Sequence, residues 1–249
     1  MANERLRAAI YNAGLRLEEV ADAIGCDRKT VERWIEGHVP YRRNQYALAR
    51  LVDADPGYLW PAGSADTAGD LAMAELLGVW PVRSQVPVAA WVELFAGARE
   101  RIDILCYAAF WLSEEPAVRE TLAAKARGGV PVRMLLGDPG SEAVRRRGDE
   151  EGIGDAVAAK ITNTMHNYRE LFATPGAELR LHDTTLYASV YRADDDMLAS
   201  THLYGLPGHM TPLLRLRRVP GAQLFASYAD SFERVWDLAH PVGAGQQVA

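Results

Sequence analysis

The spacing of apolar residues changes on either side of one short segment, residues 61–70, and this change divides the chain. Before the segment, apolar side chains recur every three to four residues, which is the period of an α-helix. After it, uninterrupted apolar runs at residues 102–109 and 130–136 alternate with helical stretches. The segment itself, PAGSADTAGD, contains Pro, Gly and small residues without periodicity, which is typical of a linker. The sequence therefore predicts an all-α domain followed by an α/β domain.

A length of 249 residues fits two unequal domains, since one domain has about 150 residues. We predict an all-α domain at 1–63, a linker at 64–78, an α/β domain at 79–240 and a flexible tail at 241–249. A hydrophobic share of 49% and a charged share of 24% exclude a disordered chain. There is no apolar run of about 18 residues and no signal-peptide core at the start, so we expect a cytoplasmic protein.

The two cysteines and six histidines do not form a metal-binding pattern. Cys26 and Cys106 lie eighty positions apart, which also argues against a disulfide framework. No two histidines are spaced four residues apart, as a helical metal site would require. We therefore expect no metal and no cofactor.

The distribution of charge leaves nucleic-acid binding open despite the net charge of −6. Residues 1–63 contain nine Lys and Arg and nine Asp and Glu, so the whole acidic excess lies in the larger domain. The small domain can therefore present a basic face to phosphate groups.

Helix end signals divide the small domain into five helices. Leu17–Ile24 has helical spacing and ends at Gly25, which favours a left-handed cap. Asp27 is a suitable N-cap for a third helix, which ends at Gly37. Two helices joined by a glycine-containing turn are typical of a DNA-binding helix-turn-helix.

The strings LEEVA at 17–21, IG at 24–25 and TVERW at 30–34, followed by Gly37 and Pro40, resemble the XRE (Cro/phage-repressor) helix-turn-helix family. The resemblance spans residues 3–60 and implies that the third helix contacts base edges. Arginine suits this role because it bonds to two acceptors of guanine. The implied contacts to bases and phosphates are Arg28, Lys29, Thr30, Arg33, Arg42 and Arg43. Trp34 is expected in the core instead.

The larger domain is predicted to be a mixed sheet of about six strands with helices on its faces. The predicted helices cover 71–77, 88–101, 116–127, 149–172 and 222–239, and the predicted strands 102–109, 130–136, 178–182, 186–192, 197–201 and 213–217. The strings VRMLLGD at 132–138 and LYASVYRAD at 186–194 are similar to one half of the phospholipase D-type fold, over residues 85–240.

That superfamily carries a His-x-Lys-x4-Asp motif, and its histidine and lysine are missing here. The aligned positions are Tyr187, Ser189 and Asp194, and a shift of register to His182 places Thr184 where the cation belongs. The chemistry needs an imidazole nucleophile and a cation beside the phosphoryl oxygens. The sequence therefore predicts a catalytically silent domain with no enzyme activity.

Polar side chains on consecutive strands nevertheless predict a small-molecule pocket. One of them, Asp138, follows the carboxyl end of a buried strand, and α/β folds bind ligands at that end. An alternative is that Tyr187, Ser189 and Tyr191 form the solvated face of an antiparallel strand. The candidate ligand-binding residues are Arg83, Asp138, Arg147, His182, Tyr187, Ser189, Tyr191, Arg192, Asp194, Thr201, His202 and Tyr204.

The domain order resembles actinobacterial XRE-type transcription regulators with a degenerate phospholipase D-like domain. This resemblance implies a homodimer on a palindromic operator in double-stranded DNA, controlled by a small-molecule effector. Two alternatives stay open at this point. One is a phosphodiesterase or nuclease that uses His182 or His202, and the other is an antitoxin-like regulator that binds another protein.

Overall fold

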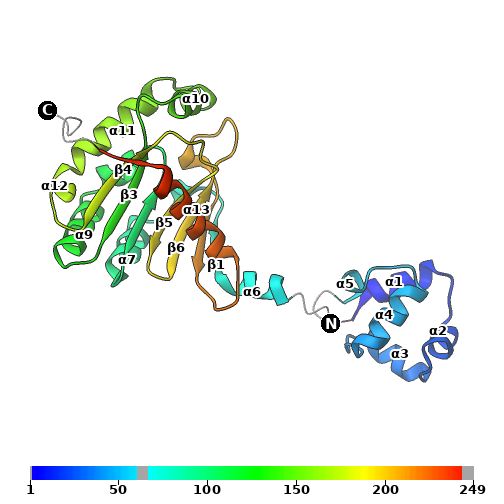
Figure 1. Cartoon of the computed structure of the whole chain (residues 1–249). Coiled ribbons are helices and arrows are strands. Elements are labelled where there is room, and N and C mark those ends of the chain that lie inside the picture. Colours follow the sequence, from blue (N-terminus) through cyan, green and yellow to red (C-terminus); the bar gives the residue numbers. More distant parts are fainter. Residues whose placement is uncertain (1, 61–66, 243–249) are drawn as a thin grey trace. The chain divides into compact units, whose positions relative to one another are not determined.

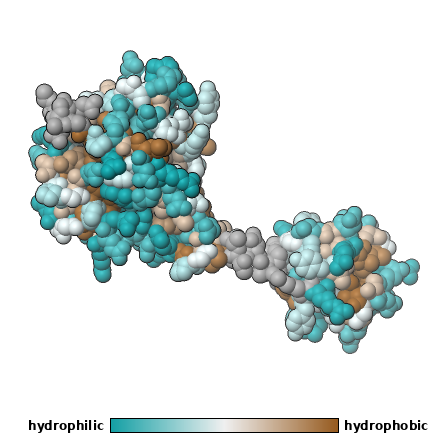
Figure 2. All heavy atoms as spheres, viewed as in Figure 1, coloured by the Kyte–Doolittle hydropathy of each residue, from teal (hydrophilic) through white to brown (hydrophobic). Residues whose placement is uncertain are grey.

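A computed structural model describes residues 2–60 and 67–242 of the chain (Figure 1). The chain divides into two compact units, residues 1–67 and 68–249. In each unit the apolar side chains gather in a core of its own, and the visible surface is largely hydrophilic (Figure 2). None of the described helices is both long and apolar enough to cross a membrane.

In the first unit, residues 2–60 form five helices around a small apolar core. They are α1 (Glu4–Asn12), α2 (Leu17–Ile24), α3 (Arg28–Ile35), α4 (Arg42–Leu51) and α5 (Pro56–Leu59). Leu6, Val31, Leu48 and Leu59 are fully buried. Trp34 is also buried, as its helical spacing predicts.

The turn between α2 and α3 follows from its sequence. Gly25 adopts a φ of 77°, a left-handed conformation that glycine reaches without steric cost. The Asp27 carboxylate then accepts a hydrogen bond of 2.8 Å from the Thr30 amide and so caps α3. These two residues fix where α2 ends and α3 begins.

The second unit is one mixed eight-stranded sheet with helices packed on it. The strand order is β1-β7-β6-β5-β2-β3-β4-β8, with β2, β3 and β4 parallel and the other pairs antiparallel. The strands are β1 (Leu76–Trp80), β2 (Ile102–Leu105), β3 (Val132–Gly137), β4 (Ala177–His182), β5 (Ala188–Ala193), β6 (Asp196–Thr201), β7 (Leu213–Arg217) and β8 (His240–Pro241).

The helices of this unit connect and cover the strands. They are α6 (Thr67–Glu75), α7 (Val88–Gly97), α8 (Phe110–Glu114), α9 (Pro116–Arg127), α10 (Glu142–Glu150), α11 (Ala156–Asn167), α12 (Arg169–Phe172) and α13 (Leu224–Leu238), with two 3-10 turns, η1 (Arg83–Gln85) and η2 (Gly208–Met210). Tyr191 packs on Trp91 of α7, whereas the next residue, Arg192, lies over Phe225 of α13. Because neighbouring strand residues point to opposite faces, α7 and α13 cover different faces of the sheet.

A buried ionic network joins the sheet to α13. The Asp103 carboxylate is fully buried and lies 2.8 Å from Arg133 Nε and 3.6 Å from Arg192 Nη1. Arg133 also donates two hydrogen bonds, of 2.7 and 2.9 Å, to Glu233 of α13. Two cations therefore compensate a carboxylate that would be costly to bury alone.

The structure corrects several predicted boundaries. The predicted helix at 71–77 overlaps α6, but α6 begins earlier, at residue 67, and residues 76–80 form β1 instead of a linker. The described part of the chain contains eight strands instead of the expected six. The predicted helix at 149–172 is broken, because Gly152 and Gly154 adopt positive φ values of 69° and 51°. The predicted tail overlaps β8 at its start, and residues 243–249 and the linker residues 64–66 lie outside the described residues.

Candidate functional site

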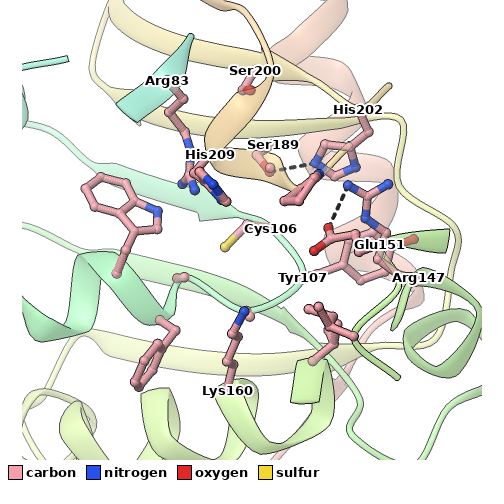
Figure 3. Close-up of a pocket in the computed structure, with 18 of the residues that line it drawn as sticks. Arg83, Cys106, Tyr107, Arg147, Glu151, Lys160, Ser189, Ser200, His202 and His209 are labelled. Carbon is pink, nitrogen blue, oxygen red and sulfur yellow. Dashed lines mark hydrogen bonds and ion pairs between the residues drawn. The ribbon is translucent and has the colours of Figure 1, made fainter. Parts of the chain in front are cut away.

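A pocket of about 320 Å³ lies beyond the carboxyl end of β2, on the face of the sheet covered by α7 (Figure 3). The connection from β2 to α8, residues 106–109, forms part of its wall. The sequence assigned these four residues to a strand, but Ala109 adopts a φ of 51° and the chain turns there. The other wall residues lie in or directly beside β5, β6, α8, α10, α11, η1 and η2.

The centre of the site is a serine–histidine pair carried by two neighbouring strands. Residues 188–193 of β5 pair antiparallel with residues 196–201 of β6. His202, just beyond β6, continues this register, because its amide donates a 2.8 Å hydrogen bond to the carbonyl of Tyr187. The Ser189 hydroxyl consequently lies 2.9 Å from His202 Nε2.

The hydrogen bonds of His202 define its tautomer. Nδ1 lies 3.1 Å from the carbonyl oxygen of Leu186, and a carbonyl oxygen can only accept a hydrogen bond. Nδ1 therefore carries the proton. Burial, assisted by the nearby Arg147 charge, lowers the pKa of His202 to about 4, so the ring is neutral at pH 7. Nε2 is then unprotonated and accepts the hydrogen bond from the Ser189 hydroxyl.

Tyr107 holds this imidazole in place. Its ring stacks on the His202 ring, with centroids 5.6 Å apart and an angle of 26° between the planes. Its hydroxyl accepts a 3.0 Å hydrogen bond from the amide of Leu186, the residue whose carbonyl faces Nδ1. Both the ring plane of His202 and its carbonyl partner are thus fixed by one side chain.

Cationic side chains surround the pair. Arg147 is buried and bonded to Glu151 at 2.7 Å, so its charge is compensated. Arg83 lies over the Trp111 ring at 4.7 Å. Among the residues that the structure describes, neither Arg83 nor Lys160 has a carboxylate within ion-pair distance. Two uncompensated cations therefore border the pocket and favour an anionic ligand.

Lys160 reaches toward the pocket from α11, on the side opposite to Arg83 and His209 (Figure 3). Sequence analysis missed both Lys160 and His209. Lys160 lies in a helix without any motif, and His209 lies in a short 3-10 turn. Within residues 2–60 and 67–242, no group of three His, Cys, Asp or Glu side chains is arranged to hold a metal ion.

The structure brings five of the predicted ligand residues together in the pocket wall, namely Arg83, Arg147, Ser189, Tyr191 and His202. The other predicted residues are absent from this wall, and they are Asp138, His182, Tyr187, Arg192, Asp194, Thr201 and Tyr204. Tyr187 and Tyr204 are 81% and 87% exposed, respectively. His182 is buried, and its Nε2 faces the carbonyl of Cys106 at 3.4 Å.

The remaining polar residues have visible structural roles. The Asp138 carboxylate accepts a hydrogen bond from the Gly140 amide, in the turn after β3. Arg192 belongs to the ionic network beneath α13. The Asp194 carboxylate accepts three backbone hydrogen bonds, from residues 99, 100 and 101, which anchors the turn between β5 and β6. The sequence pattern of polar residues along the strands could not distinguish these structural roles from ligand binding.

The predicted DNA-contacting residues lie on α3 and in the first turn of α4, with Arg33 in the last turn of α3. Lys29 and Arg33 of α3 and Arg43 of α4 are exposed. The Thr30 hydroxyl donates to the Asp27 carboxylate at 3.1 Å. Arg42 begins α4, and its side chain lies outside the described part of the chain.

Arg28 is the predicted base-contacting residue with the most internal partners. Its guanidinium bonds to Glu18 at 2.7 Å and to Glu32 at 2.8 Å. Exposed ion pairs of this kind contribute little to stability, so a phosphate or base can compete with them.

Residues 72–243 match the model of a domain family described as a domain of unknown function, DUF5919. The chain belongs to the DUF5919 family. The matched range contains both the serine–histidine pair and all the pocket cations. No curated protein matches the chain.

Several solved structures are similar to the chain at low identity. Nuc from Salmonella typhimurium, a phospholipase D family member, is 14% identical, with a TM-score of 0.40 over 66% of this chain and 94% of its own. TrmBL2, an archaeal chromatin protein with a novel mode of DNA binding, is 14% identical, with a TM-score of 0.42; the match covers 86% of this chain and 66% of TrmBL2. The phosphatidylserine synthase of Haemophilus influenzae Rd KW20 is 14% identical, with a TM-score of 0.44; the match covers 66% of this chain and 38% of the synthase.

The expectation that the DUF5919 domain is not an enzyme is corrected here. The motif alignment placed the histidine on the strand of Ser189 or directly before it, and the sequence analysis kept an enzyme that uses His182 or His202 only as an alternative. In the structure, the imidazole beside Ser189 comes from the end of the next strand, through His202.

Proposed function

We propose that the DUF5919 domain hydrolyses phosphodiesters, with His202 as the general base. The observation that carries this proposal is a neutral imidazole with an unprotonated Nε2 in a pocket bordered by uncompensated cations. A base must be unprotonated before it can accept a proton, and the pKa of His202 meets this condition at pH 7. His182 is the weaker candidate because it is buried outside the pocket wall.

The cations have a separate task in this reaction. Negative charge on the phosphoryl oxygens is stabilised by donors and cations that are already in place. Arg83 and Lys160 border the pocket from opposite sides and suit this task (Figure 3). The phosphodiester anion is thus held between them while His202 takes up the proton of the attacking group.

Hydrolysis of bis(p-nitrophenyl) phosphate by the full chain tests the proposal. The H202Q variant should lose activity about 100-fold or more, since it removes the base. The matched control is H166Q, because His166 is exposed on α11 and absent from the pocket wall; it should retain full activity. Absence of hydrolysis by the unaltered protein, or equal activity of H202Q, would refute the proposal.

We also propose that the first unit is an XRE-type helix-turn-helix that binds double-stranded DNA and regulates transcription. The exposed cations of α3 and α4 and the Gly25–Asp27 turn support this part. Binding of a homodimer to a palindromic operator predicts a footprint with two half-sites about 34 Å apart. A footprint of one half-site at saturating protein would contradict the dimer, and failure to retain any promoter fragment at low salt would contradict DNA binding.

A small-molecule effector remains part of the same proposal. A pocket of about 320 Å³ suits a ligand of nucleotide size, since small-molecule sites begin at about 300 Å³. A non-hydrolysable phosphodiester that binds the folded domain should raise its melting temperature. If it also changes operator affinity, the two sites are linked, and an unchanged affinity would remove the effector from the proposal.

A further inference from the structure

The pocket wall contains several hydroxyl groups, and their surroundings differ. The Ser189 hydroxyl is the one that faces an imidazole nitrogen. The Ser200 hydroxyl bonds instead to Thr211 Oγ1 at 2.8 Å and to the Pro212 carbonyl at 3.0 Å. Burial raises the pKa of Tyr191 to about 12, which keeps its phenol protonated.

We infer that Ser189 is the nucleophile of this pocket and forms a covalent phosphoseryl intermediate with the phosphodiester. The inference rests on the proposed function, and it adds a second residue and a two-step course to the reaction. A nucleophilic hydroxyl needs a base at hydrogen-bonding distance and a third group that orients the base. Ser189, His202 and the Leu186 carbonyl meet these three requirements at 2.9 and 3.1 Å.

The first step forms one bond and breaks one. Ser189 Oγ attacks phosphorus, and its proton passes to His202 Nε2. The bond from phosphorus to one ester oxygen breaks, and the leaving alkoxide takes the proton from Nε2 and departs as an alcohol. Ser189 then carries a phosphoryl group that retains its second ester.

The second step restores the serine. A water molecule attacks the same phosphorus and gives a proton to His202 Nε2, while the bond between phosphorus and Ser189 Oγ breaks. The serine oxygen takes the proton from Nε2, and the product is a phosphomonoester. Over both steps one phosphodiester and one water give one alcohol and one phosphomonoester, with no redox change.

The geometry explains why Ser189 can act as the nucleophile although its own strand carries no cation in the pocket. The Ser189 side chain is largely buried, and its backbone is fixed by the β5–β6 ladder. Its hydroxyl therefore stays within reach of Nε2 without the entropy loss of ordering a long side chain. Arg83 and Lys160 supply the positive charge from η1 and α11 instead.

A phosphorofluoridate probe tests the nucleophile directly. Diisopropyl fluorophosphate should add one diisopropylphosphoryl group to the full chain, with release of fluoride, and peptide mapping should locate it on Ser189. S189A should remain unlabelled. S227A is the matched control, because Ser227 lies on α13 and its hydroxyl bonds to the Gln223 carbonyl. S227A should be labelled to the same extent as the unaltered protein. In the unaltered protein, Ser200 should carry no adduct.

Turnover of bis(p-nitrophenyl) phosphate separates this inference from the proposed function. S189A should lose at least about 100-fold in activity if Ser189 is the nucleophile. Hydrolysis that persists in S189A, together with an unlabelled Ser189, would overturn the inference and leave the proposed hydrolase intact. Labelling of Ser189 without phosphodiester turnover would support the nucleophile and overturn the substrate class. Mapping the adduct on the unaltered protein keeps the test independent of how S189A folds.

Discussion

The neutral state of His202 predicts a specific loss of stability in acid. The pKa of this residue falls from an ordinary value of 6.5 to about 4 in the folded protein, mainly through burial. Between these two values the unfolded chain binds a proton that the folded domain does not. Stability therefore rises with pH across this window and is lost as the pH falls below 6.5.

The size of the effect follows from the two pKa values. Acidification from pH 7 to pH 4.5 should cost about 2 kcal/mol of unfolding free energy through this one group. For a domain of this size, about 1 kcal/mol corresponds to 2–4 °C in melting temperature. The acid-induced drop in melting temperature of the second unit should therefore be about 4–8 °C larger in the unaltered protein than in H202Q.

Differential scanning calorimetry at both pH values measures this difference. The transition of the second unit is identified by its larger enthalpy, since unfolding enthalpy grows with domain size. Titrating groups far from His202 are common to both proteins and cancel in the comparison. H166Q should behave like the unaltered protein. An equal acid response in the unaltered protein and H202Q would refute the lowered pKa of His202 and the base role built on it.

Three further predictions concern packing, the ionic network and DNA. Gly148→Ala should lower the unfolding free energy by about 2 kcal/mol or more by calorimetry, because its Cβ would overlap the Gly154 carbonyl. Arg133→Met should cost about 3–5 kcal/mol in the same assay, because it removes the nearest cation from the buried Asp103 carboxylate. Lys29→Ala should weaken DNA binding measured by fluorescence anisotropy and reduce the slope of log affinity against log salt by about 1; an unchanged slope would exclude a phosphate contact.

Local signals were sufficient to predict the helices of the first unit and the mixed sheet of the second. Gly25 and Asp27 mark helix ends through backbone freedom and side-chain capping, which act within a few residues. The run at 102–109 was assigned wholly to a strand, because apolar side chains line both β2 and the turn that follows it. Strand β1 was missed, since its pairing with β7 is a contact across more than 130 residues.

The site was harder to predict than the fold, because its members come from separate elements. Ser189 and His202 were both singled out, but their pairing depends on the antiparallel register of β5 and β6. A motif search along one strand cannot detect a partner on the next. Lys160 had no local signal, and Tyr187 matched a motif position yet points into solvent.

The hairpin of β5 and β6 has a consequence for how this domain diversifies. The serine–histidine pair is encoded within fourteen consecutive residues, Ser189 to His202, and its spacing depends on a single strand ladder. The charged residues that would select a substrate lie on other segments, at Arg83, Arg147 and Lys160. Substitutions in those segments can therefore change the ligand preference while the hairpin that places Ser189 beside His202 stays unaltered.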